Sequence, residues 1–281
     1  MIRAKKSLGQ NFLSDQRVAR RIIDSVSPLA DDIIVEIGPG AGALTRMLAK
    51  QSGYVVAVEI DARFVDELQR TVKTDNLSVV NRDALNMDWI EFTKSAMSML
   101  HPPRRDYPDR RRVRVVANLP YYISTPIIEK LLPLGRDRLF DMTLMLQKEV
   151  ADRITTGPGS KAYGYLSVMV QYYCEAMKLF EVPPSAFTPE PKVQSAVIRL
   201  TVRERPAVEV ADEARFFALV RAAFAQRRKT ILNNLKAGAR SLEFKQPVES
   251  ALEAAGVASR RRAETLSLGE FAALCAALYR E

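Results

Sequence analysis

The segment Asp32–Gly42 reads DIIVEIGPGAG and joins an apolar, β-branched run to a glycine-rich turn. An apolar run of this length that ends in glycines predicts a strand buried on both faces, from Asp32 to Ile37. A helical pattern follows over residues 43–50, so the stretch predicts a strand–turn–helix unit of a parallel sheet. Glycines in such a turn let the backbone bend sharply and let a ligand approach closely. The spacing is neither G-x-G-x-x-G nor G-x-x-x-x-G-K-[ST], which disfavours a dinucleotide or a nucleoside triphosphate.

The same alternation of strand and helix continues on both sides of this unit. Further strands are expected at residues 54–60, 77–81, 113–117, 139–146 and 195–202, and helices at 16–25 and 62–72. Strands that alternate with helices predict an α/β fold with an open, mostly parallel sheet and right-handed crossovers. Residues 91–112 are rich in Pro and Arg and predict a long surface loop, or a short helix followed by a loop.

The C-terminal part of the chain has a different pattern. After an expected linker at residues 203–206, helices are expected at residues 214–225, 230–237, 248–254 and 268–278. Short helices separated by Gly and Pro are typical of a small helical domain. We therefore expect two domains, residues 1–205 and residues 206–281.

Composition limits the cellular setting. The chain has 281 residues, of which 47% are hydrophobic, so it can bury a large core. No apolar run approaches the roughly 20 residues that span a bilayer, and the first residues lack the apolar core of a signal peptide. Cys174 and Cys275 are too few for a disulfide framework and lack metal-type spacing. We expect a reduced, cytoplasmic, monomeric protein that does not contact a membrane.

The chain has a single histidine, His101, which lies in the stretch HPPRRDYPDRRR. One histidine makes a histidine-based triad or a zinc site hard to build. We expect His101 to lie exposed in a loop, no metal to be bound, and the chemistry to work without imidazole.

The charge is positive and clustered. The chain has 42 basic and 33 acidic residues, for a net charge of +9. Basic side chains gather in four places: Arg3, Lys5, Lys6, Arg17, Arg20 and Arg21; six arginines within residues 104–114; Arg227, Arg228 and Lys229; and Arg260, Arg261 and Arg262. Four such clusters favour a surface that follows the phosphates of a nucleic acid.

Two carboxylates follow the second and third expected strands. Glu59 lies about twenty residues after the glycines, where a carboxylate can accept hydrogen bonds from both hydroxyls of a ribose. Asp83 follows the next strand and can reach an adenine amine. Ligands of such sheets lie beyond the carboxyl ends of the strands, where these features and the glycine turn converge. They indicate an adenosine-containing ligand without a pyrophosphate, and S-adenosylmethionine fits that description.

The tetrapeptide Asn118-Leu119-Pro120-Tyr121, which follows the fourth strand, indicates the reaction. It stands among KSLGQNFL (residues 6–13), EIGPGAG (36–42), NLPYYISTP (118–126), PPSAFTPEPKVQSAV (183–197) and RAETLS (262–267). On these motifs, which run nearly end to end, the chain resembles the ribosomal RNA adenine dimethyltransferases, most closely those of the bacterial small subunit. The resemblance implies a Rossmann-like class I S-adenosylmethionine-dependent methyltransferase sheet with a small C-terminal all-helical domain that helps to hold RNA.

The resemblance also implies roles for single residues. The expected cofactor-binding residues are Asn11, Leu13, Gly38, Gly40, Glu59, Asp83 and Asn118, and the expected catalytic residues are Asn118, Leu119, Pro120, Tyr121 and Phe187. The Asn118 and Leu119 carbonyls would accept the two N–H bonds of an adenine amine, and Tyr121 and Phe187 would stack on the base. The implied substrate is a pair of adjacent adenosines in a hairpin loop near the 3′ end of 16S rRNA, in the immature small ribosomal subunit.

The sequence departs from the family pattern at two places, and three other functions are alternatives. Many family members have Asn where this chain has Tyr122, and the Arg-rich stretch before the fourth strand is not typical. We expect altered packing at Tyr122 and unchanged chemistry. The alternatives are a large-subunit rRNA adenine methylase of the macrolide-resistance type, a non-catalytic ribosome assembly factor and a DNA adenine methylase.

Overall fold

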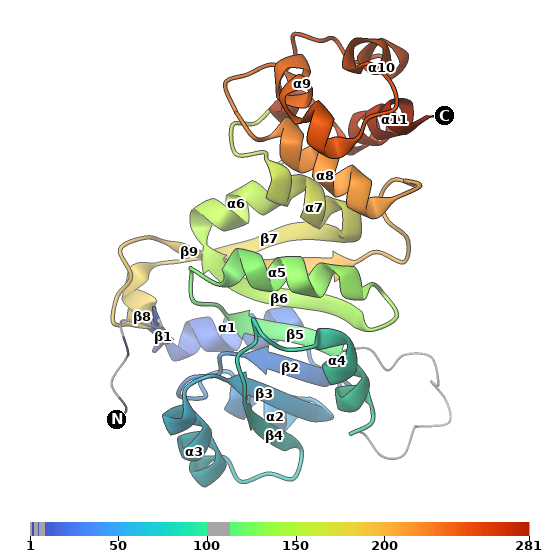
Figure 1. Ribbon diagram of the computed structural model, residues 1–281. Helices are drawn as coiled ribbons and strands as arrows, with labels where there is room; N and C mark the ends of the chain where they lie inside the picture. The colour runs from blue at the N-terminus through green and yellow to red at the C-terminus, as the bar shows by residue number, and fades with distance from the viewer. Residues whose placement is uncertain (1, 3–4, 6–8, 100–112, 281) are drawn as a thin grey trace. The chain divides into compact units, whose positions relative to one another are not determined.

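The computed structural model describes residues 2, 5, 9–99 and 113–280 (Figure 1). The chain divides into two compact units: residues 1–151 with 175–204, and residues 152–174 with 205–281. This division differs from the expected boundary at residue 205, because residues 152–174 pack with the C-terminal helices. Tyr163, Val168 and Tyr172 are buried in the same apolar cluster as Phe216 and Phe271.

The first unit is built on a seven-stranded sheet of order β4-β3-β2-β5-β6-β9-β7. Its strands are β2 (Ile33–Ile37), β3 (Tyr54–Glu59), β4 (Leu77–Asn81), β5 (Val113–Asn118), β6 (Leu139–Gln147), β7 (Cys174–Val182) and β9 (Ser195–Val202). The pairs from β4 through β6 are parallel, and β9 is antiparallel to β6. The expected open, mostly parallel sheet is confirmed.

The register of the sheet brings the carboxyl ends of four strands to one edge. Glu59 at the end of β3 pairs with Asn81 at the end of β4. Ile37 at the end of β2 pairs with Ala117 of β5, the residue before Asn118. The turns that leave β2, β3, β4 and β5 therefore start side by side, which is where ligands of such sheets bind.

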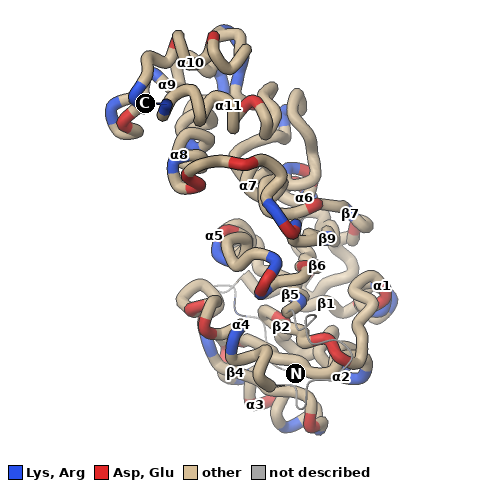
Figure 2. The backbone as a smooth tube through the Cα atoms, turned by 90° about the vertical axis from the view of Figure 1, so that its right-hand side faces the viewer, with Lys and Arg blue, Asp and Glu red and all other residues tan. Residues whose placement is uncertain are grey.

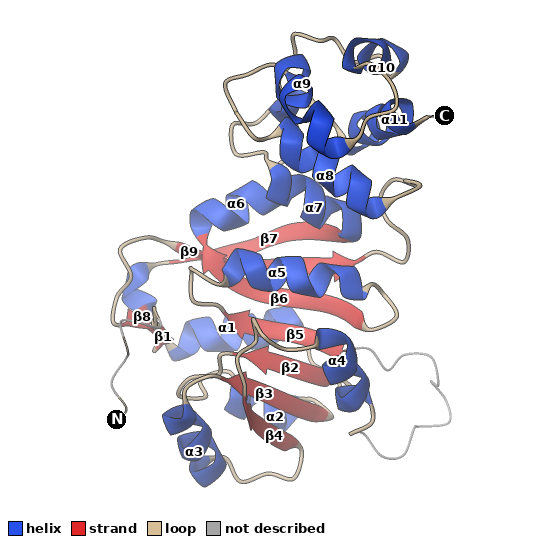
Figure 3. Ribbon diagram, viewed as in Figure 1, coloured by secondary structure: helices blue, strands red, loops and turns tan. Residues whose placement is uncertain are grey.

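Helices cover both faces of this sheet. They are α1 (Gln16–Val26), α2 (Thr45–Gln51), α3 (Ala62–Thr71), α4 (Trp89–Met97) and α5 (Ser124–Leu131). In Figure 1, α1 and α2 lie behind the strands and α4 and α5 lie in front, and Figure 3 shows the same helices in blue against the red sheet. The buried residues of α1 are Ala19, Ile22, Ile23 and Val26, the spacing of one helical face.

A second, two-stranded sheet joins the N-terminal segment of the first unit to the connection between β7 and β9. In it β1 (Phe12–Leu13) is antiparallel to β8 (Phe187–Thr188), and Leu13 pairs with Phe187. The Ala186 carbonyl also accepts hydrogen bonds from the Ser14 and Asp15 N–H groups, at 2.9 and 3.1 Å. This pairing holds Phe187 beside the N-terminal segment.

The second unit is helical. It contains the second half of α6 (Lys148–Thr155), together with α7 (Tyr165–Tyr173), α8 (Glu213–Ala223), α9 (Ile231–Leu242), α10 (Val248–Ala254) and α11 (Leu268–Tyr279). Asp212, Thr230 and Ser267 cap the N-termini of α8, α9 and α11, because their side-chain oxygens accept backbone N–H bonds in the first turn. Within the part of the chain that the structure describes, no helix has both the length and the apolarity needed to cross a membrane.

Candidate active site

A pocket opens at the edge of the sheet where the carboxyl ends meet. It comprises about 1020 Å³ of space free of protein atoms, including open solvent at its mouth. Its lining residues come from the N-terminal segment and the turns after β2, β3, β4 and β5, with Phe187 added: Gly9, Gln10, Asn11, Phe12, Ile37, Gly38, Gly40, Val58, Glu59, Ile60, Arg82, Asp83, Ala84, Leu85, Asn118, Leu119, Pro120, Tyr121, Tyr122, Ile123 and Phe187.

The glycine turn after β2 has the backbone conformation that its sequence predicts. Gly38 and Gly40 have φ of +69° and +51°, values that side chains other than glycine rarely adopt. A Cβ atom on Gly40 would lie 3.0 Å from the Phe12 ring, which packs directly over the turn. The turn is therefore thin enough for a ligand to approach its backbone, and Phe12 covers it from the N-terminal segment.

Glu59 holds this turn against the end of β3. One of its carboxylate oxygens accepts the Gly40 N–H at 3.0 Å, and the other accepts the Asp61 N–H at 2.9 Å. The side chain is buried, and burial raises the pKa of the Glu59 carboxyl above its usual range. Each oxygen keeps a further lone pair, so the carboxylate can accept hydrogen bonds from a ligand in the pocket.

A second buried carboxyl, Glu36, lies two residues before Gly38. Its pKa is raised to about 7, chiefly by burial and also by the charge of Glu59, although hydrogen bonding from Thr45 lowers it. Its Oε2 atom has no hydrogen-bond partner among the residues that the structure describes. Glu36 does not line the pocket. Glu36 is thus a buried ionisable group that precedes the glycine turn and does not face the pocket lining.

Asp83 follows β4 and lines the pocket. Its carboxylate accepts the Leu85 N–H at 2.9 Å and the Asn86 side-chain amide at 2.7 Å. The first bond closes a short turn that fixes the Asp83 backbone after the strand. Asp83 thus lies where the sequence predicts an acceptor for an adenine amine.

The turn after β5 contributes Asn118 and Leu119 to the lining of the pocket. The Asn118 side-chain amide donates a hydrogen bond from Nδ2 to the Asn11 backbone carbonyl at 3.1 Å. This bond fixes which atom of the amide is the donor and leaves Oδ1 as the acceptor. The Leu119 side chain is buried and its N–H donates to the Met145 carbonyl at 3.3 Å, which anchors the turn to β6.

Two aromatic side chains from distant parts of the sequence, Tyr121 and Phe187, line the same pocket. Tyr121 follows Pro120 in the turn, and its hydroxyl is hydrogen-bonded to the hydroxyl of Ser195 at 2.9 Å. Phe187 belongs to β8 and is buried, with 3% of its surface exposed. A flat base entering the pocket can stack on such rings.

The structure brings nearly all of the expected site residues together. Asn11, Gly38, Gly40, Glu59, Asp83, Asn118, Leu119, Pro120, Tyr121 and Phe187 all line the pocket. Leu13 does not line it; its side chain lies in the apolar core, and its backbone pairs with that of Phe187. Its contact with a cofactor therefore has no support from the lining of the pocket.

Several lining residues were not predicted from the sequence. Phe12 covers the glycine turn, and Ile60, 49% exposed, follows Glu59 into the pocket. An exposed apolar residue directly after a strand-end carboxylate is a signal that could have identified Ile60. Tyr122 also lines the pocket and is 57% exposed, with its ring 3.3 Å from where a Cβ of Gly9 would lie.

The basic clusters differ in what surrounds them. Along α1, the residues Arg17, Arg20 and Arg21 are exposed, and Figure 2 shows basic positions on this helix. The expectation of a phosphate-binding surface is wrong for Arg114, which is buried and forms ion pairs at 2.7 Å with Asp32 and with Asp141. Arg3, Lys6, His101 and the other arginines of residues 104–112 lie outside the described residues.

Within the described residues, no group of three or more His, Cys, Asp and Glu side chains could hold a metal ion.

Comparisons with known proteins match this chain over almost its whole length. The sequence model of the family described as "Ribosomal RNA adenine dimethylase" matches residues 1–276. The chain is 47% identical over 283 residues to "Ribosomal RNA small subunit methyltransferase A" of Shouchella clausii, covering 98% of this chain and 90% of the relative. It is 48% identical over 276 residues to the protein of the same name from Geobacillus thermodenitrificans, with the same coverage.

Two solved structures share the fold. A dimethyladenosine transferase from Plasmodium falciparum aligns with a TM-score of 0.73 and 26% identity, over 94% of this chain and 95% of that one. The 23S rRNA methyltransferase ErmE aligns with a TM-score of 0.68 and 28% identity, over 95% of this chain and 99% of that one. These neighbours confirm the expected class I methyltransferase fold. The match to the family model and the identity to full-length relatives show that this chain belongs to the ribosomal RNA adenine dimethylase family.

Proposed function

We propose that this protein transfers methyl groups from S-adenosylmethionine to the N6 amine of two adjacent adenosines in 16S rRNA. Each adenosine is methylated twice, to N6,N6-dimethyladenosine, during small-subunit biogenesis. The observation that carries the proposal is the convergence, in one pocket, of the Asn118 amide and Leu119 backbone with Glu59 and the glycine turn. The family to which the chain belongs is described by the same reaction.

The pocket suits S-adenosylmethionine. A buried carboxylate, Glu59, can accept hydrogen bonds from the ribose hydroxyls, and Asp83 can accept one from the adenine amine. Gly38 and Gly40 have no side chains, so the amino-acid part of the cofactor can approach their backbone. Asn11 and Phe12 lie across that turn from the N-terminal segment. We propose that these residues hold the cofactor.

The turn after β5 activates the target amine. An adenine amine is a weak nucleophile because its lone pair is delocalised into the ring. The Asn118 Oδ1 and Leu119 carbonyl oxygens accept its two N–H bonds and favour the pyramidal, more positive amine of the transition state over the flat ground state. The bond from Asn118 Nδ2 to the Asn11 carbonyl holds the amide with Oδ1 as the acceptor. Tyr121 and Phe187 hold the base by stacking.

When bound, the cofactor supplies a methyl group on a positively charged sulfur, which leaves as a neutral thioether. Glu59, Asp83 and the glycine turn would hold the cofactor so that the adenine nitrogen could take up this methyl group, with the sulfur as the leaving group and the amine proton lost to water. Holding nitrogen and carbon in line supplies most of what the protein must add, so no histidine is needed. Because the target base must leave its stack, a hairpin loop is the least costly place to reach it.

The small-subunit substrate is favoured over the alternatives by the relatives. The proteins with 47% and 48% identity are named as small-subunit methyltransferases, whereas the 23S rRNA methyltransferase is 28% identical. The family is described by its action on ribosomal RNA, which argues against a DNA substrate. A role in assembly without catalysis is disfavoured because the acceptor residues of the pocket are all in place.

Three loops of the second unit lie together. The Ile231 N–H at the start of α9 donates to the Arg261 carbonyl at 2.7 Å, and the Gly159 N–H donates to the Glu264 carbonyl at 2.7 Å. The side chain of Arg227 also donates to the Lys161 carbonyl. These bonds join residues 157–161, 226–231 and 258–264 into one surface, which we call the three-loop surface.

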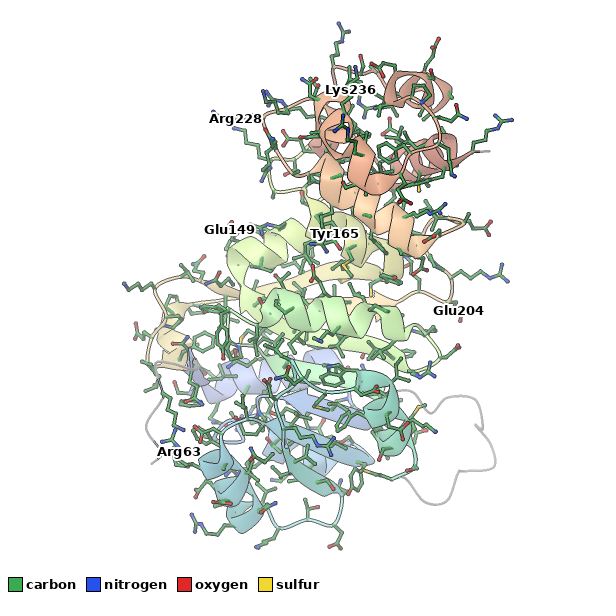
Figure 4. All side chains as sticks on the ribbon, in the orientation of Figure 1. Arg63, Glu149, Tyr165, Glu204, Arg228 and Lys236 are labelled. Atoms are coloured by element: carbon green, nitrogen blue, oxygen red, sulfur yellow. The ribbon has the colours of Figure 1, made fainter. Side chains whose placement is uncertain are left out.

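Exposed cations crowd the three-loop surface: Lys161, Arg228, Lys229, Arg260 and Arg262. Figure 4 shows the side chain of Arg228 extending away from the ribbon. A group of exposed cations on segments fixed by backbone bonds suits the phosphates of folded RNA. We propose that residues 206–281, together with residues 157–161 of the same unit, hold rRNA through this surface, while the rest of residues 1–205 binds the cofactor. We also propose that the protein acts as a monomer in the cytoplasm on immature small subunits.

Tritiated methyl transfer tests the proposed function. Immature small subunits from a strain lacking the modification are incubated with the protein and labelled S-adenosylmethionine, and large subunits serve as the comparison. We expect label in the 3′-terminal fragment of 16S rRNA and none in large subunits. Asn118→Ala should abolish incorporation while leaving subunit binding intact. Incorporation that persists in Asn118→Ala, or appears in 23S rRNA, contradicts the proposal.

A further inference from the structure

The hydroxyl of Tyr121 is bonded to a residue of a distant strand. Its partner, the Ser195 hydroxyl, lies 2.9 Å away and 74 residues later in the sequence. Ser195 is buried, with 1% of its surface exposed, whereas Tyr121 is half-buried and lines the pocket. Ser195 itself does not line the pocket, so its contact with the site is through the tyrosine.

Ser195 is held rigidly by the sheet. It is the first residue of β9 and pairs with Gln147, the last residue of β6. The next residue along β6's chain, Lys148, donates its N–H to the Gln194 carbonyl at 2.9 Å, which closes the pairing at this end. Because β6 also pairs with β5 up to Asn118, the serine is fixed in the same frame as the turn that carries Tyr121.

Tyr121 is therefore tied at two points. The Ser124 hydroxyl donates to the Tyr121 backbone carbonyl at 3.0 Å, and Ser195 is bonded to the phenol at the far end of the side chain. The hydroxyl oxygen of a tyrosine lies on the long axis of its ring, so anchoring both the backbone and the hydroxyl fixes the direction of that axis and the χ1 rotamer of the side chain. A base can stack only on a ring that stays in place, and without this bond the Tyr121 ring is free to leave its position through another χ1 rotamer.

We propose that Ser195 is a positioning residue, which orients the Tyr121 ring as the stacking face for the target adenine. The inference rests on the proposed function and gives a role to a buried serine that does not line the pocket. Ser195 does not touch the base. It acts through the phenol, so its effect should depend on the presence of the Tyr121 hydroxyl.

A double-mutant cycle tests the inference. The variants are Ser195→Ala, Tyr121→Phe and the two combined. Three quantities are measured: kcat/KM for methyl transfer to the RNA, affinity for a labelled target-loop hairpin by fluorescence anisotropy without cofactor, and the midpoint of thermal unfolding. Thr143→Val is the matched control, because it removes a buried hydroxyl from β6 of the same sheet, and that hydroxyl has no partner among the described residues. Ser195→Thr keeps the hydroxyl and is the conservative variant.

Each single variant should lower kcat/KM and hairpin affinity by about five- to tenfold, the loss expected for one hydrogen bond. The combined variant should be no more than about twofold worse than either single one, because both remove the same bond. Ser195→Thr should recover most of the loss, and Thr143→Val should remain within about twofold of wild type.

Other outcomes would contradict either the role of Ser195 or the proposed function. Losses that multiply in the combined variant overturn the positioning role, as does a Ser195→Ala protein with unchanged kcat/KM and hairpin affinity. A loss in Ser195→Ala that Thr143→Val shares, together with the same fall in unfolding midpoint, assigns Ser195 to the sheet alone and also overturns the inference. A wild-type protein that methylates no RNA contradicts the proposed function itself.

Discussion

Glu59→Gln changes one atom of the side chain that joins the glycine turn to the end of β3. The Glu59 carboxylate accepts the Gly40 N–H at 3.0 Å with one oxygen and the Asp61 N–H at 2.9 Å with the other. A glutamine side chain has one carbonyl oxygen and one NH₂ group. Whichever way the amide is turned, its NH₂ group faces a backbone N–H, and one of the two bonds is lost.

The expected losses follow from this geometry. A hydrogen bond to a charged acceptor contributes about 1.5–3 kcal/mol, so losing one lowers the free energy of unfolding. Removing a buried charge whose pKa is raised by burial offsets part of that loss, which leaves a decrease of about 1–2 kcal/mol. The ribose loses one charged acceptor as well, and the Kd for S-adenosylmethionine should rise by about 10- to 100-fold.

Isothermal titration with S-adenosylmethionine measures the Kd, and urea unfolding measures the stability. Glu67→Gln is the matched control, since it neutralises a partly exposed carboxylate on α3 that does not line the pocket. It should leave the Kd unchanged. A Glu59→Gln protein that binds the cofactor within twofold of wild type would refute the reasoning about the ribose site.

Three further substitutions address the groups around the pocket and the sheet. Burial raises the pKa of Glu36 from 4.5 to about 7, so between these pH values the folded protein keeps a proton that the unfolded chain loses. The free energy of unfolding therefore falls by about 3 kcal/mol as the pH rises from 4.5 to 7. Glu36→Gln removes this slope, and urea unfolding should show it more stable than wild type at pH 8 and equal to it at pH 4.5; parallel pH profiles contradict this. Arg114→Met leaves its two aspartate partners without their cation and should lower the free energy of unfolding by about 3–5 kcal/mol in the same assay, whereas a loss under 1 kcal/mol argues against a buried ion-pair network. Tyr122→Asn changes an exposed ring and leaves the acceptor turn intact, so steady-state kinetics should give a kcat within about twofold of wild type, and a tenfold drop contradicts unchanged chemistry.

Much of the first unit's sheet could be predicted because its strands carry a strong local signal. Ile33–Ile37 is apolar except for Glu36 and is followed by glycine, Tyr54–Glu59 is an apolar run that ends in a carboxylate, and the structure places strands at both. The helix before them, Gln16–Val26, shows the spacing of a buried face. Parallel topology then follows from the alternation of strand and helix.

The elements that were not predicted lack such a signal. β1 and β8 have two residues each, too few for any periodicity. α7 has the sequence YLSVMVQYY, whose β-branched and aromatic residues favour a strand, and it is a helix because it is buried against other helices. The strand β7, CEAMKLFEV, mixes charged and apolar residues without alternation. The place of residues 152–174 in the second unit depends on contacts far along the chain.

The site shows the same division. Residues at the ends of neighbouring parallel strands could be placed together from topology alone, which is why Gly38, Glu59 and Asp83 were predicted to meet. Asn118 was predicted to join them on the family resemblance, and all four line one pocket. The Ser195 hydroxyl could not be predicted, because its bond to the tyrosine depends on the register between β6 and β9.

The most direct test of the account is a crystal structure of the protein with S-adenosylhomocysteine and the target hairpin. The account predicts that N6 of the flipped adenine lies about 2.7–3.2 Å from both Asn118 Oδ1 and the Leu119 carbonyl oxygen, with the ligand's sulfur facing the same nitrogen. A complex in which the sulfur ligand occupies another edge of the sheet, or the adenine amine points away from that turn, would contradict it.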